Sequence, residues 1–250
     1  MIILFALVFM RMTGAIMLNP VLGRSNIPGA VKGATIFVLS FLLYGTTDGV
    51  LVQEPTVMLE FGFMLFKELM VGFAIGFSME LCFVVVRFAA AVVDYTMGLS
   101  MAQVYDPQYN TQMTITSGMY YTFLVLLFLT GNGHVHLLGL IYHSAQLVPF
   151  GQVHVQPQLG ELMLEIFKRS IVMGMQFAFP IIAMELVTEA AVGILMRVIP
   201  QINVFSVNFQ LKIIVGLLML VFLFNPMAGK LYTVIDNMFI YIEEALMVLS

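Results

Sequence analysis

The sequence predicts an all-α protein embedded in a membrane, and three observations carry this prediction. Of its 250 residues, 61% are hydrophobic and only 10% are charged, whereas soluble domains carry about 25% charged residues. The hydrophobic residues form long blocks, without the sustained alternation that is typical of half-buried strands. Gly and Pro lie between the blocks, where they are expected to end helices and form turns.

Eight apolar blocks are expected to form the helices. They are Met1–Leu22, Val31–Tyr44, Val57–Val86, Phe88–Met97, Met119–Thr130, Ser170–Met196, Lys212–Phe224 and Leu231–Ser250. We expect the first block to be a retained helix and not a signal peptide, because it lacks a basic start and Arg11 interrupts it. Two blocks, Val31–Tyr44 and Met119–Thr130, are shorter than the roughly 20 residues that a spanning helix needs.

No Ser- or Pro-rich linker divides the chain, so we expect one unit over residues 1–250. Apolar helices are expected over 1–105, a loop over 105–118, and helices and loops over 119–250. The net charge is −4 and the basic residues are scattered, which argues against a nucleic-acid partner. Arg24 and Lys32 suggest that the first loop is cytoplasmic. The single cysteine, Cys82, is expected to be a small core residue.

Charged residues inside the apolar blocks need polar partners, because a charge at the centre of a membrane helix costs about 2.5–3.5 kcal/mol. Glu80, Arg87 and Asp94 recur every seven residues and so share roughly one helix face. Glu185 and Glu189 are one turn apart, with Arg197 two turns further on. These residues either pair within the chain or contact partner subunits, and both interpretations stay open here.

A nearly uncharged polar segment, residues 98–118, lies between two apolar blocks. Non-helical backbone at membrane depth must be shielded from lipid, because each unpaired N–H or C=O group there costs several kcal/mol. The segment is therefore either a loop outside the membrane or irregular chain that lines a protein-enclosed pathway.

Two further patterns concern packing. Gly72 and Gly76 form a small-xxx-small pattern that lets another helix backbone approach closely. Methionine is abundant, with 21 residues, and Met97, Met101 and Met119 lie near the polar segment. Because methionine is flexible and polarizable, these residues are either apolar filler or a deformable seal around a passage.

Catalytic motifs are missing from the sequence. It contains neither a phosphate-binding Gly-Lys-Ser/Thr motif nor a Gly-x-Ser-x-Gly elbow, and the acids Glu185 and Glu189 lack an accompanying base. Loop or interface roles are favoured over zinc binding for the four histidines, His134, His136, His143 and His154, because no local acid or thiol completes a ligand set. We expect no enzyme activity, no metal and no cofactor.

A set of motifs, in order, resembles the FliR family of type III secretion export-gate proteins nearly from end to end. The motifs are Phe5–Arg11, Ile27-Pro28 with Lys32, Lys67–Phe77, Gly98–Pro107, Leu129–His134, Pro149–Gly151, Ala178–Pro180 and Pro200–Phe205. Each motif alone is weakly diagnostic, but their order and spacing together are specific.

The resemblance implies a core subunit of the flagellar protein export gate in the bacterial inner membrane, at the flagellar basal body. Such proteins join FliP and FliQ in a helical, cone-like hetero-oligomer that passes unfolded rod, hook and filament proteins. FlhB and FlhA act with this gate on the cytoplasmic side. Short, interrupted helical hairpins raised above the bilayer plane would explain the short blocks and the charges inside them.

The resemblance also implies roles for individual residues. A plug for the closed channel is expected at Tyr105, Asp106, Pro107, Gln108, Tyr109, Asn110, Thr111, Gln112 and Met113. The family's Met-rich constriction is attributed chiefly to FliP, so Met97, Met101 and Met119 are a candidate seal only through the flexibility of methionine. The candidate subunit interface comprises Lys67, Glu68, Gly72, Gly76, Glu80, Arg87, Asp94, Glu185, Glu189, Arg197, Pro200, Gln201 and Phe205.

Three alternative functions remain open. A subunit of a virulence injectisome would share the family but export effectors. A small-solute transporter would carry a substrate site near the bilayer midplane, formed by broken helices. A structural membrane scaffold would enclose no conduit.

Overall fold

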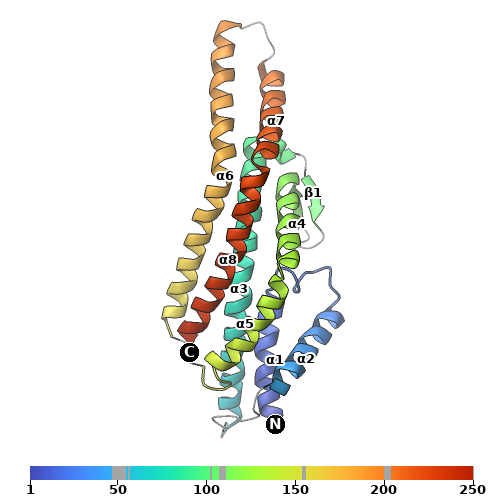
Figure 1. Cartoon of the computed structure of the whole chain (residues 1–250), viewed down its shortest axis with the longest axis vertical. Coiled ribbons are helices and arrows are strands. Elements are labelled where there is room, and N and C mark those ends of the chain that lie inside the picture. The colour runs from blue at the N-terminus through green and yellow to red at the C-terminus, as the bar shows by residue number, and fades with distance from the viewer. Residues whose placement is uncertain are drawn as a thin grey trace. The chain divides into compact units, whose positions relative to one another are not determined.

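The structure is a computed structural model that describes residues 1–46, 55, 57–101, 103–106, 111–153, 156–199 and 204–249. Of residues 101, 103–106, 111 and 204–206 it describes the backbone alone. Figure 1 shows the elements in order: α1 (Ile2–Met17), α2 (Gly29–Thr46), α3 (Met58–Thr96), the 3₁₀ turn η1 (Leu99–Met101), β1 (Gln103–Asp106), β2 (Thr111–Thr114), α4 (Ile115–Thr130), α5 (Gly133–Leu147), α6 (Gln158–Val198), α7 (Val204–Phe222) and α8 (Phe224–Leu249). Helices make up most of the described chain, which confirms the all-α class.

The chain forms two compact units, each assembled from segments that are distant in sequence. Unit 1 contains Met1–Cys82, Phe128–Lys168 and Ile235–Ser250, and unit 2 contains Phe83–Leu127 and Arg169–Val234. Helices α3, α6 and α8 each supply residues to both units. The division therefore does not follow a linker in the sequence, and the expectation of one domain stays a prediction.

Several helices are longer than the apolar blocks. The third and fourth blocks form one helix, α3, because Arg87 lies within it and does not interrupt it. Helix α6 begins at Gln158, since the charged stretch before Ser170 is also helical. Helix α5, which carries three histidines, was not expected as a block.

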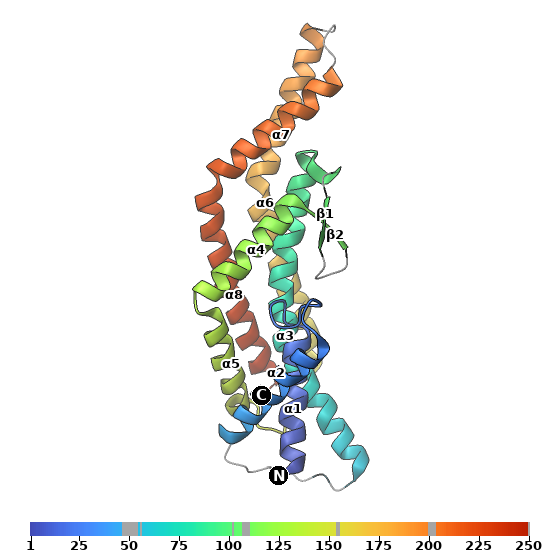
Figure 2. The same cartoon turned by 90° about the vertical axis from the view of Figure 1, so that its right-hand side faces the viewer.

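The polar loop expected over 105–118 is partly regular, which corrects its boundaries. β1 and β2 pair antiparallel, with Gln103 opposite Thr114 and Asp106 opposite Thr111. α4 then starts at Ile115, four residues before the expected block. The hairpin, labelled in Figure 2, leads through β2 directly into α4.

Three of the described helices, α2, α3 and α6, are long and apolar enough to span a membrane. The number rises to five if each bent pair, α4 with α5 and α7 with α8, forms one span, while α1 is a shorter apolar helix. These helices establish an all-α membrane protein.

The core of unit 1 depends on a close approach of α1 and α3. Gly72 leaves no room for a side chain, because a Cβ built there would collide with the carbonyl of Arg11 on α1. A Cβ at Gly76 would lie 3.0 Å from the carbonyl oxygen of Ala15. The close approach expected from the glycine pattern is present, and the neighbour is a helix of the same chain.

Helix α1 also packs against α2 (Figure 1), where the ring of Phe5 meets those of Phe37 and Tyr44 edge to face.

The core of unit 2 packs around α3 and α4. Tyr120 is buried and meets the ring of Phe177 on α6 edge to face, with 4.9 Å between centroids. A Cβ on Gly174 of α6 would collide with the side chain of Val85 on α3. These contacts place α3, α4 and α6 in one packed core.

The close contact at Gly72 can be tested with two glycine substitutions on α3. We expect Gly72→Ala to destabilise the protein, because the added methyl group forces two backbones apart and overpacking of this kind costs roughly 1–3 kcal/mol. Gly62→Ala is the matched control on α3, where a Cβ would meet nothing within 4 Å. That change should be neutral or slightly stabilising, since Ala is the better helix former. Thermal unfolding in detergent measures both, and equal midpoints for the two variants would contradict the close packing.

Candidate functional site

Arg11 is the centre of a buried polar cluster in unit 1. Its side chain is fully buried, and its Nε donates to Oε2 of Glu68 on α3 over 2.7 Å. Its Nη1 donates to the carbonyl of Ser144 over 2.9 Å, and its Nη2 donates to the carbonyl of Val148 over 2.8 Å. The guanidinium therefore joins α1, α3 and the end of α5.

The last carbonyls of α5 explain why a cation is favoured here. The final carbonyl groups of a helix lack partners within the helix and carry the negative end of its dipole. Ser144 lies in the last turn of α5, and Val148 is the residue that caps it. Arg11 satisfies the Val148 carbonyl and adds a second donor to the Ser144 carbonyl, which also accepts the backbone N–H of Val148. The cation therefore reinforces the C-terminal cap of α5.

Glu68 completes the cluster from the opposite side. It is fully buried, and its Oε1 accepts the backbone N–H of Gly151 over 2.9 Å. Gly151 has φ of 86°, a left-handed conformation that favours glycine. The ring of Phe150 lies 4.2 Å from the guanidinium carbon of Arg11, which adds a cation–π contact. The carboxylate thereby fixes the turn that follows α5.

The cluster unites residues that the sequence presented separately. Arg11, Glu68 and the Pro149–Gly151 turn appeared in three different motifs, and Arg11 was not named as a site residue. The sequence does contain a signal for Arg11, namely a lone arginine in an apolar helix. Such an arginine requires a buried acid or several carbonyls as partners.

A second buried acid, Asp94 in the last turn of α3, contacts the start of α4 within unit 2. Its Oδ2 accepts the backbone N–H of Thr116 over 2.8 Å, and its Oδ1 accepts the Thr116 hydroxyl. A carboxylate is favoured at this position, since the first N–H groups of a helix lack partners within it and carry the positive end of its dipole. About two turns earlier on α3, the Arg87 carbonyl accepts the Ser117 hydroxyl over 2.9 Å. Asp94 therefore anchors the strand-to-helix junction that follows the hairpin.

Arg87 also faces α4. Its guanidinium carbon lies 5.3 Å from the centre of the Tyr121 ring, within range of a cation–π contact. The seven-residue spacing had placed Arg87 and Asp94 on one face of a helix, and both face α4.

The hairpin contains the described part of the expected plug. Tyr105 and Asp106 lie in β1, and Thr111, Gln112 and Met113 lie in β2. Gln112 is exposed and Met113 is half-buried. The remaining expected plug residues, Pro107, Gln108, Tyr109 and Asn110, lie outside the described residues.

Gly98 connects α3 to this hairpin. Its φ of 78° lies in the left-handed region, where residues with a side chain are disfavoured. A Cβ there would lie 3.1 Å from the ring of Phe209 on α7. Both constraints require glycine at the point where the chain leaves α3.

The three candidate seal methionines differ in their surroundings. Met97 is fully buried and packs on Gly216 of α7, where a Cβ would collide with its side chain. Met119 is 44% exposed, and the side chain of Met101 lies outside the described atoms. Met97 is thus a packing residue in this structure, and a sealing role for the set stays a prediction.

The interface candidates differ in how far they are buried. Glu68, Gly72, Gly76 and Asp94 are buried in contacts within the chain. Lys67, Glu80 and Arg87 are half-buried, while Glu189 and Arg197 are exposed. Pro200, Gln201 and the side chain of Phe205 lie outside what the structure describes.

The two glutamates of α6 also differ, since Glu185 is buried and Glu189 is exposed. Glu189 accepts from Nζ of Lys212 on α7 over 3.1 Å. Glu185 is 3% exposed, and its carboxylate has no hydrogen-bond partner among the described residues. A role in subunit contacts stays a prediction for the exposed members.

The histidines do not converge with other ligands in the described part of the chain. His134, His136 and His143 are exposed along α5, and the ring of His136 stacks on that of Phe239. His154 lies outside the described residues. Among the described residues no three His, Cys, Asp or Glu side chains are grouped closely enough to hold a metal ion.

The Arg11 cluster generates a double-mutant test. Arg11→Met or Glu68→Met alone should destabilise the protein by about 3–5 kcal/mol, because each leaves an uncompensated buried charge. The combined change should recover much of this loss, since the pair is then replaced by apolar side chains of similar length. Thermal unfolding in detergent measures all three variants. Strictly additive losses would show that the two side chains do not interact.

The sequence profile of the family described as bacterial export proteins, family 1, matches residues 2–238. The chain is similar to the flagellar biosynthetic protein FliR of Bacillus subtilis strain 168, with 30% identity over 242 residues that cover 94% of this chain and 90% of that protein. It is similar to FliR of Escherichia coli K12, with 28% identity over 92% of this chain and 88% of that protein. FliR of Aquifex aeolicus is 29% identical over 88% of this chain and 84% of that protein. This chain belongs to the bacterial export proteins, family 1.

Proposed function

We propose that this protein is a core subunit of the flagellar type III protein export gate, in which it assembles with FliP and FliQ in the bacterial inner membrane. The observation that carries the proposal is the match to one export family over residues 2–238, together with relatives named FliR along nearly the whole chain. FlhB and FlhA are the proposed cytoplasmic partners, and unfolded rod, hook and filament proteins are the proposed cargo.

Within this gate, we propose that residues 105–113 plug the closed channel. The pairing of β1 with β2 supports such a role, because paired strands satisfy one another's N–H and C=O groups where the chain is not helical. A two-stranded hairpin is only marginally stable by itself. The hairpin therefore keeps its position through its base, where Asp94 holds Thr116 and where Gly98 ends α3.

The side chains of the plug suit a movable segment. Gln, Asn and Thr can exchange hydrogen bonds with one another for bonds to water or to the backbone of a passing chain. In the closed state the hairpin blocks ions, and in the open state it moves aside while Asp94 retains the start of α4. Transport of this kind requires no bond to be made or broken in the cargo, in keeping with a role that is not enzymatic.

Co-expression with FliP and FliQ, followed by conductance recording, tests the two parts of the proposal separately. We expect the full chain to co-purify with both proteins as a discrete complex of low conductance. Deletion of Gln108–Gln112 should leave the complex intact and raise its ion leak severalfold, since the plug is shortened while its base is kept.

The matched control replaces the same five residues with Gly and Ser, so that chain length is preserved and the side chains are lost. We expect its leak to fall between those of the wild type and the deletion. Failure to co-purify would refute the subunit assignment. A complex that forms but leaks no more after the deletion would refute the plug alone.

A further inference from the structure

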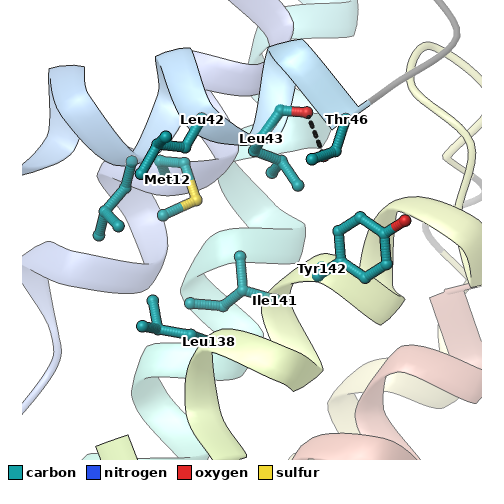
Figure 3. A pocket seen from close by; sticks show the side chains of 8 residues that line it. Met12, Leu42, Leu43, Thr46, Leu138, Ile141 and Tyr142 are labelled. Carbon is teal, nitrogen blue, oxygen red and sulfur yellow. Dashed lines mark hydrogen bonds between the residues drawn. The ribbon is translucent and has the colours of Figure 1, made fainter. Parts of the chain in front are cut away.

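A hollow in unit 1 shows how a polar side chain beside apolar ones is usually satisfied in this protein. The hollow has a volume of about 190 Å³ and lies among α1, α2 and α5. None of its described lining residues is charged. The hydroxyl of Thr46 at its edge donates to the carbonyl of Leu43 over 2.8 Å (Figure 3), so this polar group is satisfied within its own helix.

Glu185 on α6, in unit 2, has no such partner. The residue is only 3% exposed, and both oxygens of its carboxyl group are buried without a hydrogen-bond partner among the described residues. The nearby hydroxyl of Thr188 is already used, because it donates to the carbonyl of Met184 over 3.0 Å. Glu185 is therefore a buried acid that no described hydrogen bond stabilises.

The position of Glu185 is one that an apolar side chain ordinarily fills. Buried residues in this part of α6 recur every three or four positions, at Phe177, Ile181, Glu185, Thr188 and Val192. This is the spacing of a helix face that packs against a core. A carboxylate buried there without a partner is far more costly than the neutral carboxylic acid, so the surroundings of Glu185 are those of the neutral form.

Two charged side chains act on Glu185 in opposite senses. Lys212 on α7 attracts its carboxylate, and Glu189, one turn later on α6, repels it. Lys212 itself donates to Glu189 over 3.1 Å. It is also the one charged residue in the sequence of α7, which lies beside α6 (Figure 1). One ammonium group therefore serves two carboxyl groups.

The other helices that pack on α6 in unit 2 supply no further charge to Glu185. The sequence of α4 has no charged residue. On α3, Arg87 lies over the ring of Tyr121 and Asp94 accepts from Thr116, so both face α4. The balance at Glu185 is thus set by Lys212 and Glu189.

We propose that Glu185 is a proton-binding site that controls the ion pair between α6 and α7. With the proton bound, Glu185 is neutral and Lys212 pairs with Glu189, which is the pairing present in the structure. When the proton leaves to solvent, the ionised Glu185 draws Lys212 away from Glu189, because an ion pair is stronger where water is excluded. The group of three then changes from net neutral to one negative charge.

The exchange requires no movement of either helix. Glu185 and Glu189 are four residues apart, so their side chains are neighbours on one face of α6, and the flexible four-carbon stem of lysine can turn from one to the other. The carboxylate left without a partner is that of Glu189, which is 58% exposed and can be solvated. The site depends only on the packing of α6 against α7 and does not rest on the proposed channel.

Infrared spectroscopy of the full chain, purified in detergent with any subunits that accompany it, detects the proton directly. The carbonyl band of a neutral carboxylic acid is separate from the bands of a carboxylate. Exposed acids ordinarily ionise at about pH 4, so an acid band that remains at about pH 6 comes from a buried group. We expect such a band in the wild type, its loss as the pH is raised, and its absence from about pH 6 upward in Glu185→Gln.

Two neighbouring substitutions should move the pH of this loss in opposite directions. Lys212→Met removes the nearby cation, so Glu185 should keep its proton to a higher pH. Glu189→Gln removes the competing carboxylate and leaves Lys212 to Glu185 alone, so the proton should be lost at a lower pH. Each shift should be about one pH unit or more, the usual effect of a charge this close.

The matched controls change charges elsewhere on the same helix. Arg197→Gln removes an exposed cation two turns beyond Glu189, and Glu161→Gln removes an exposed acid at the start of α6. Both variants should show the wild-type band and lose it at the wild-type pH.

Several outcomes would overturn the proposal. A wild type without an acid band at about pH 6 would refute the proton site, and this result requires no variant to fold. A band that persists in Glu185→Gln would place the proton on another residue. Unchanged titration in both Lys212→Met and Glu189→Gln would refute the exchange of ion pairs. A band present in the isolated chain but missing when other subunits are bound would show that Glu185 pairs with a cation of another subunit instead.

Discussion

The ion pair between Arg11 and Glu68 is the interaction on which unit 1 depends. Both side chains are fully buried, and each has further partners in a different segment: Arg11 holds the end of α5, and Glu68 holds the Gly151 turn. A buried charge is tolerated only when it is paired and hydrogen-bonded. Arg11 lies on α1, Glu68 lies on α3 and the Val148 carbonyl lies at the end of α5. These three segments must come together before the guanidinium and the carboxylate have all their hydrogen-bond partners.

The same rule operates at the hairpin. Asp94 supplies the start of α4 with a carboxylate that its own sequence lacks, just as Arg11 supplies the end of α5 with a cation. In both places a charged residue of one helix caps the terminus of another: Arg11 lies within α1, and Asp94 lies in the last turn of α3. Charges that would be costly in a lipid-bathed helix thereby fix the points where the chain stops being helical. This arrangement gives the proposed plug a firm base.

The helical class could be predicted from the sequence because it depends on local composition. The apolar blocks located α1, α2 and most of α3, and the Gly72 pattern located a close helix contact. The seven-residue spacing grouped Glu80, Arg87 and Asp94, and two of these, Arg87 and Asp94, face α4. Helix α5 was missed because its histidines and glutamine make it less apolar than its neighbours, and the hairpin was missed because each strand has only four residues.

The partners of the charged residues could not be predicted in the same way. Arg11 and Glu68 are 57 residues apart, and Arg11 and Ser144 are 133 apart, so no periodic pattern connects them. Asp94 accepts the backbone N–H and the hydroxyl of Thr116, which is 22 residues away, and the backbone contact leaves no mark in the sequence. Helix termini attract charges of known sign, but the sequence does not say which distant residue supplies the charge.

Amide hydrogen exchange at Gly151 tests most directly whether the Arg11–Glu68 cluster holds unit 1 together. Gly151 lies in a turn, so its N–H would exchange quickly unless the buried Glu68 carboxylate accepts it. We expect this amide to exchange as slowly as those in the helix cores, and to lose its protection in Glu68→Leu. Exchange at the rate of an unstructured peptide in the unaltered protein would contradict the cluster and the packing derived from it.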